Sequence, residues 1–71
     1  MSDLESRLLA AHACGDRAAL VTLYSAAAED AAEDEARYFY LTQAYVYALE
    51  DGHPQAPALR ARLVAAGRES A

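Results

Sequence analysis

Apolar residues crowd the middle of the chain, between positions 36 and 51. Five of the six aromatic residues of the chain lie between Tyr38 and Tyr47. No proline or glycine interrupts the segment, so it predicts a helix of about 16 residues, roughly 24 Å long at 1.5 Å per residue. Its apolar side chains do not form a single stripe. A helix that is apolar on most sides has to be covered on most sides, so we expect the other segments to pack around this one.

At about 100° per residue, the apolar side chains of this segment fall on three separate faces. One face carries Tyr38, Leu41, Tyr45, Ala48 and Leu49. The second carries Tyr40, Ala44 and Tyr47, and the third carries Phe39, Gln43 and Val46.

The residues before this segment predict two shorter helices. Gly15 suits the left-handed position after a helix end, and Asp16 suits the N-cap of the helix that follows. Ser2 and Glu5 fit a capping box at the start of the first helix. Because the chain has no glycine or proline between Asp16 and the end of the central segment, a single long helix is an alternative. We predict a break in the acidic run 29–35, with Asp34 as N-cap, because the two halves need different faces buried.

The residues after the central segment predict a fourth helix. Gly52 ends the central helix as a left-handed cap. Proline is tolerated in the first turn of a helix, so the next helix begins near Pro54 or Pro57. It carries Leu59, Leu63 and Ala66 inward and ends at Gly67.

These elements predict an all-α fold of four helices in one domain spanning 1–71, paired as antiparallel hairpins. The first hairpin covers about 3–31 and the second about 34–67. A compact four-helix bundle is the alternative arrangement.

The two hairpins resemble each other, because Gly15 and Gly52 lie 37 residues apart at corresponding turns. A period in the thirties made of two helices is typical of tetratricopeptide-like solenoids. The residues that match this family in order are Tyr24, Ala27, Ala28, Ala36, Tyr38, Leu41, Tyr45 and Gly52. The resemblance implies two stacked hairpins, in which the helix at 36–51 contacts the other three helices.

Charge and cysteine content narrow the classes of partner. The net charge of the 71 residues is −5, with −6 in residues 1–35 and +1 in residues 36–71. An acidic chain is a poor ligand for nucleic acid or for an anionic membrane. No stretch approaches the roughly 20 apolar residues of a membrane span, and residues 1–9 lack the apolar core of a signal peptide. The single Cys14 cannot form an internal disulfide, so we expect a soluble cytoplasmic protein.

Chemical groups of possible catalytic use gather at the two predicted turns. His12, Cys14 and Asp16 lie near one turn, and Asp51 and His53 lie near the other. They could meet as a metal site, but their spacing matches no standard zinc pattern. A thiol–imidazole nucleophile would need a substrate-binding loop that the sequence lacks. We therefore expect no enzyme activity, no cofactor and no metal.

The aromatic residues give the best functional hypothesis. Three neighbours cannot cover every face of the helix at 36–51, so either its second or its third face should stay partly open. Tyrosine is enriched at interfaces because it offers a large apolar area with a polar tip, and Ala44 between two tyrosines predicts a shallow notch. The expected partner-binding residues are Phe39, Tyr40, Gln43, Ala44, Val46 and Tyr47. The alternative is that these tyrosines only complete the core.

Two functions remain open from the sequence. The first is a small interaction module that binds a protein, a peptide or another copy of itself through the helix at 36–51. The second is an acidic regulator that occupies a basic site on a partner protein through residues 29–35.

Overall fold

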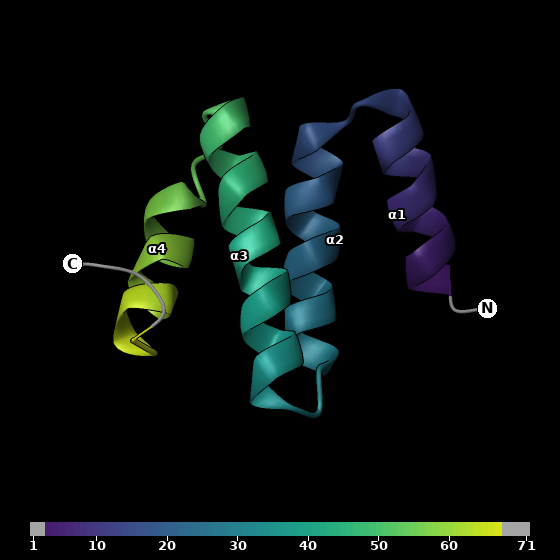
Figure 1. The fold of residues 1–71 in the computed structure, drawn as a ribbon. Coiled ribbons are helices and arrows are strands. Elements are labelled where there is room, and N and C mark those ends of the chain that lie inside the picture. Colours follow the sequence, from purple (N-terminus) through teal and green to yellow (C-terminus); the bar gives the residue numbers. More distant parts are fainter. Residues whose placement is uncertain (1–2, 68–71) are drawn as a thin grey trace.

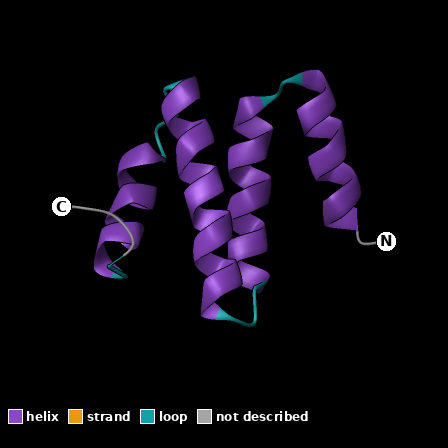
Figure 2. Ribbon diagram, in the orientation of Figure 1, coloured by secondary structure: helices purple, strands orange, loops and turns teal. Residues whose placement is uncertain are grey.

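The computed structural model describes residues 3–67, which form four helices joined by short turns (Figure 1). These are α1 (Asp3–Cys14), α2 (Arg17–Asp30), α3 (Asp34–Asp51) and α4 (Ala56–Ala65). The described residues contain no strand (Figure 2). The predicted all-α fold of four helices is confirmed.

The turn between α1 and α2 has the predicted chemistry. Gly15 adopts a left-handed φ of 66°. The Asp16 side chain accepts a hydrogen bond from the Ala19 amide at 3.1 Å and so caps α2. The capping box proposed at the start of α1 involves Ser2, which lies outside the described residues.

The break between α2 and α3 is confirmed, and its position is shifted by one residue. α2 ends at Asp30, and Ala31 and Glu33 have extended backbones. The N-cap of α3 is Glu33 rather than Asp34, and its side chain forms no capping hydrogen bond. Asp34 instead lies in the first turn, where it accepts a 2.7 Å hydrogen bond from Arg37. An ion pair within the helix therefore replaces the side-chain cap that we predicted.

The second half of the chain ends its helices as expected. Gly52 follows α3 with a left-handed φ of 63°. α4 begins at Ala56 with Pro57 in its first turn, where the missing amide hydrogen costs no helical hydrogen bond. Leu59 and Leu63 face the core, as predicted. α4 ends at Ala65, two residues before the left-handed Gly67, and Ala66 is its C-cap and is only partly buried.

The four helices lie side by side in chain order and alternate in direction (Figure 1). The molecule is flat, with extents of 33 × 29 × 12 Å. The contact between α2 and α3 is the most extensive of the helix–helix contacts. α1 packs against α2, and α4 packs against α3.

Three alanines of α2 and α3 belong to the core cluster. Ala28, Ala44 and Ala48 are all fully buried, with no exposed surface. Helix axes approach more closely where the side chains between them are small. Val21, Leu41, Leu59 and Leu63 complete the same core cluster.

The expectation that α3 contacts all three other helices is wrong for the backbone. Cα atoms of α3 come within 8 Å of α2 and α4, whereas no described Cα atom of α1 lies that close to α3. Side chains bridge the wider space, since the ring of His12 in α1 lies 5.8 Å from that of Tyr47 in α3. The rings of His12 and Tyr47 lie between α1 and α3. The backbone of α1 is too far away to cover this side of α3.

Leu41 gives a direct test of this core, because it is 1% exposed within the core cluster that α2, α3 and α4 share. A buried Leu→Ala change costs about 2–5 kcal/mol, and a domain of this size rarely has more than about 3–5 kcal/mol of stability. We expect Leu41→Ala to be largely unfolded at room temperature by circular dichroism. The matched control is Leu9→Ala, which alters a side chain that is 62% exposed and should change stability by no more than about 0.5 kcal/mol. Equal urea midpoints for the two variants would contradict the assigned core.

Candidate partner-binding surface

A row of aromatic rings runs across the α2–α3 contact. The ring of Tyr24, from α2, stacks with Tyr40 at 6.2 Å and with Tyr47 at 5.9 Å between centroids. Tyr40 and Tyr47 are two turns apart on α3, about 10 Å along its axis. Tyr24 therefore lies between them, beside the fully buried Ala44. The notch that we expected a partner to fill at Ala44 is filled by the protein's own tyrosine.

His12 ends the aromatic row on the α1 side. Its Nε2 atom shares a 3.0 Å hydrogen bond with the Tyr24 hydroxyl. Its ring stands edge-on to Tyr24 at 6.0 Å and to Tyr47 at 5.8 Å. Edge-to-face ring pairs contribute about 0.5–1.5 kcal/mol beyond their burial. His12 thus ties α1 to α3, a role that we did not predict from the sequence.

The third face of α3 is the one that stays open. The side chain of Phe39 is 59% exposed and that of Val46 is 42% exposed, while Gln43 between them is partly buried. We call these three residues the open face of α3. The Phe39 ring also stands edge-on to Tyr40 at 5.6 Å, so the open face is continuous with the aromatic row.

The predicted partner-binding residues therefore fall into three groups. Phe39 and Val46 are exposed, and Tyr40, Gln43 and Tyr47 are partly buried beside them. Ala44 is buried and out of reach of a partner. Tyr24 and His12 contact these residues as well, a contact that we did not predict from the sequence.

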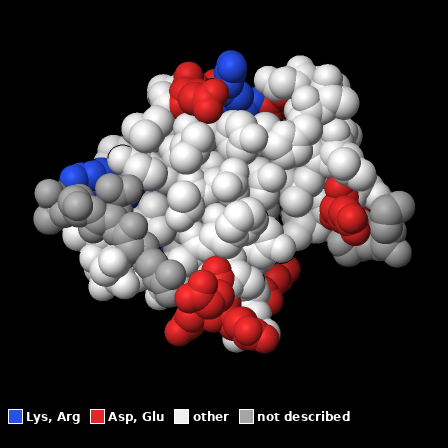
Figure 3. All heavy atoms as spheres, viewed as in Figure 1, with Lys and Arg blue, Asp and Glu red and all other residues white. Residues whose placement is uncertain are grey.

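Charged residues lie near the two ends of α3 rather than along its middle. No charged residue occurs between Tyr38 and Leu49. In Figure 3 the acidic and basic atoms gather at the rim of the molecule, and the middle of the view is uncharged. Arg62 pairs with Glu29 at 3.2 Å near the α2–α3 turn, and Arg17 pairs with Glu50 at 3.3 Å at the opposite end. Such exposed pairs stabilise by at most about 1 kcal/mol each.

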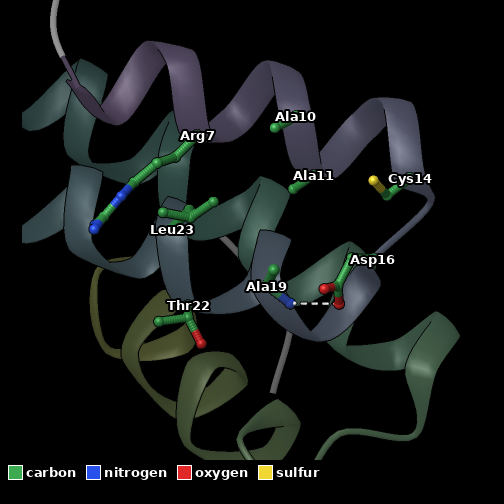
Figure 4. A pocket seen from close by; sticks show the side chains of 8 residues that line it. All are labelled: Arg7, Ala10, Ala11, Cys14, Asp16, Ala19, Thr22 and Leu23. Carbon is green, nitrogen blue, oxygen red and sulfur yellow. Dashed lines mark hydrogen bonds between the residues drawn. The ribbon is translucent and has the colours of Figure 1, made fainter.

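The residues considered as metal ligands or nucleophiles are separated in the structure. Within residues 3–67, no three histidine, cysteine or acidic side chains are placed to hold a metal ion. Cys14 and Asp16 line an open groove of about 490 Å³ between α1 and α2, where Asp16 is engaged in capping α2 (Figure 4). His12 is instead bonded to Tyr24, and His53 accepts a hydrogen bond from the Gln55 amide at 3.1 Å.

The described helices are also too short or too polar to cross a membrane. No family model, curated protein or solved structure matches this chain.

The ionisation of Tyr24 tests the aromatic row. Burial first, and then the neighbouring Tyr47 and Tyr40, raise the pKa of Tyr24 above its ordinary value of 10.0. The unfolded chain thus releases this proton at a lower pH than the folded chain does. This difference in pKa between the folded and unfolded chains has no effect on stability well below pH 10. As the pH rises through 10, it lowers the free energy of unfolding.

We expect Tyr24→Phe to lose less stability than the wild type between about pH 8 and about pH 11, measured by urea denaturation. At neutral pH the variant should be less stable by no more than about 1 kcal/mol, because the hydrogen bond to His12 is lost. The same pH dependence in both proteins would show that Tyr24 is not buried in this row.

Proposed function

We propose that this chain is a small, non-enzymatic interaction module that binds a protein or peptide through the open face of α3. The observation that carries the proposal is the exposure of two large apolar side chains, Phe39 and Val46, on one face of α3 beside the aromatic row. Leu49, on the first face, is also 57% exposed but has no exposed apolar neighbour on that face. Aromatic side chains are enriched at the centres of interfaces. The aromatic row beside the open face adds Tyr40 and Tyr47 as partly exposed rings with polar tips.

The size of the open face sets the expected affinity. Burying an exposed Phe or Val side chain completely is worth about 1.5–3 kcal/mol, and each of these is already about half covered. The pair therefore contributes roughly 2 kcal/mol, and the partly exposed tyrosines add to it. A dissociation constant of 1 mM corresponds to about −4.1 kcal/mol and 1 μM to about −8.2 kcal/mol. The contribution of this pair is below even the first of these values, so binding should be weak and reversible, with a dissociation constant nearer 1 mM than 1 μM.

We also propose that the chain is a tetratricopeptide-like pair of hairpins. Its support is the antiparallel order of the helices and the left-handed glycines, Gly15 and Gly52, that follow α1 and α3. The separation of α1 from α3 departs from the stacking that this family implies. The exposed thiol of Cys14 fits a reducing compartment such as the cytoplasm.

The acidic regulator is the second candidate function. It is favoured by the exposure of every acidic side chain around the α2–α3 turn, which are Glu29, Asp30, Glu33, Asp34 and Glu35. Two of these five already pair with arginines of the same chain, Glu29 with Arg62 and Asp34 with Arg37. Binding by charge alone should fall steeply with ionic strength, whereas binding to an apolar face should not.

A photo-crosslinking residue tests which surface is used in the cell. We expect benzoylphenylalanine at position 39 to give a discrete adduct, because its ring replaces an exposed Phe on the open face. The matched control carries the same group at position 9, an equally exposed apolar position on α1. Adding Val46→Ser to the first protein should reduce the adduct by removing half of the apolar contact. Equal adducts at both positions, or none at 39, would argue against this function.

A further inference from the structure

We infer that α1 is a releasable cover, which detaches from α2 about the turn at Gly15 while α2, α3 and α4 stay folded. This opening occurs in the free chain and needs no partner, so it is separate from the proposed function. It follows from the different ways in which the first and the last helix of the row are held.

The first helix of the row buries little of its surface. Of the described residues of α1, Ala11 alone is buried. It lies outside the core cluster, whose buried side chains come from α2, α3 and α4. Leu9 is 62% exposed, and Leu4 and Leu8 are only partly buried. The core cluster can therefore stay intact when α1 leaves.

The last helix of the row is held by the core itself. α4 places Leu59 and Leu63 in the core cluster, where they are 3% and 1% exposed. An ion pair of 3.2 Å also joins its Arg62 to Glu29 of α2. α4 cannot leave without exposing the core, so we expect it to unfold together with α2 and α3.

The space between α1 and α2 is incompletely packed. An open groove of about 490 Å³ lies between the two helices, and its lining includes Ala10 and Ala11 from α1 and Ala19 and Leu23 from α2 (Figure 4). Atoms that border a groove lack packing partners on one side. Opening this contact therefore loses fewer dispersion contacts than opening a closely packed one.

His12 links α1 to the aromatic row. It shares a hydrogen bond with the Tyr24 hydroxyl and stands edge-on to Tyr47. His12 is an exposed residue, so water can replace this hydrogen bond when α1 leaves. Opening then uncovers the α1 side of both tyrosine rings. The position of α1 thus sets how much of the aromatic row is accessible.

The turn between α1 and α2 supplies the hinge. Two backbone hydrogen bonds close it, from the Gly15 amide to the His12 carbonyl at 3.2 Å and from the Asp16 amide to the Ala11 carbonyl at 3.0 Å. Asp16 caps α2 through the Ala19 amide, so α2 keeps its cap when these two bonds break. A detached helix of 12 residues is only marginally stable in water, so we expect α1 to unfold once it leaves.

Hydrogen exchange of single backbone amides tests this opening in the full chain. It would be followed by NMR over a series of low urea concentrations. We expect the amides of α1 to be protected at least about tenfold less than those at the centre of α3. Exchange in α1 should also depend less on urea, because the opening of α1 exposes less surface than global unfolding does.

Two glycine variants form a matched pair for the same measurement. Gly15 and Gly52 have nearly equal left-handed φ angles, 66° and 63°. A Cβ atom added at either position would have no atom beyond the neighbouring residues within 4 Å. Alanine at either position therefore introduces backbone strain without a clash, which shifts an equilibrium by about tenfold.

The two variants should differ in which helices exchange faster. Gly15→Ala strains a turn that is released both when α1 opens and when the whole chain unfolds, so exchange should rise about tenfold in α1 and in α3. Gly52→Ala strains a turn that stays intact when α1 opens. Exchange should therefore rise about tenfold at the centre of α3 and stay unchanged in α1.

Two results would overturn the inference. One is equal protection and equal urea dependence in α1 and α3 of the unmodified chain, because α1 would then unfold only with the whole molecule. The other is a Gly52→Ala variant in which exchange rises as much in α1 as in α3. Neither result depends on the adduct at position 39, so failure of this opening can be told apart from failure of the proposed function.

Discussion

The close contact between α2 and α3 depends on side chains that end at Cβ. Ala28, Ala44 and Ala48 are fully buried there. Each alanine removes little apolar area from water, so the contact gains its stability from many short-range dispersion contacts between closely packed atoms. α1 and α4 are then added at the two sides of this pair, each against its neighbour in the chain. A residue as large as leucine at any of these alanines would push α2 and α3 apart and disturb the packing of α1 and α4 on them.

The same contact decides which part of α3 is available to a partner. Tyr24 comes from α2 and inserts between Tyr40 and Tyr47, which closes the second face of α3. The third face has no neighbour to cover it, because the helices follow one another in a flat row and the space nearest α1 is filled by rings. Folding and the proposed binding would therefore use different faces of one helix. A change on the open face removes no core side chain.

Local chemistry made much of the fold predictable. The left-handed glycines and the prolines at the start of α4 act through their own backbones, and Asp16 caps α2 with its side chain. The order and approximate bounds of the helices therefore follow from the sequence. The N-cap of α3 was misplaced by one residue, because several acidic residues in succession suit the start of a helix almost equally well. The open face could not be chosen in advance. That choice depends on where Tyr24 meets α3, and on His12 spanning the space to Tyr47, both of which are long-range contacts.

The most direct test of the account is the chemical accessibility of the two sides of α3. Single cysteines would replace Val46 on the open face or Ala44 on the buried face, in a chain whose exposed Cys14 is changed to serine. The account predicts that the thiol at position 46 is alkylated as fast as one in an unstructured peptide. The thiol at position 44 should react slower by orders of magnitude, because its reaction requires the α2–α3 contact to open. Equal rates at the two positions, or protection at position 46, would contradict the account.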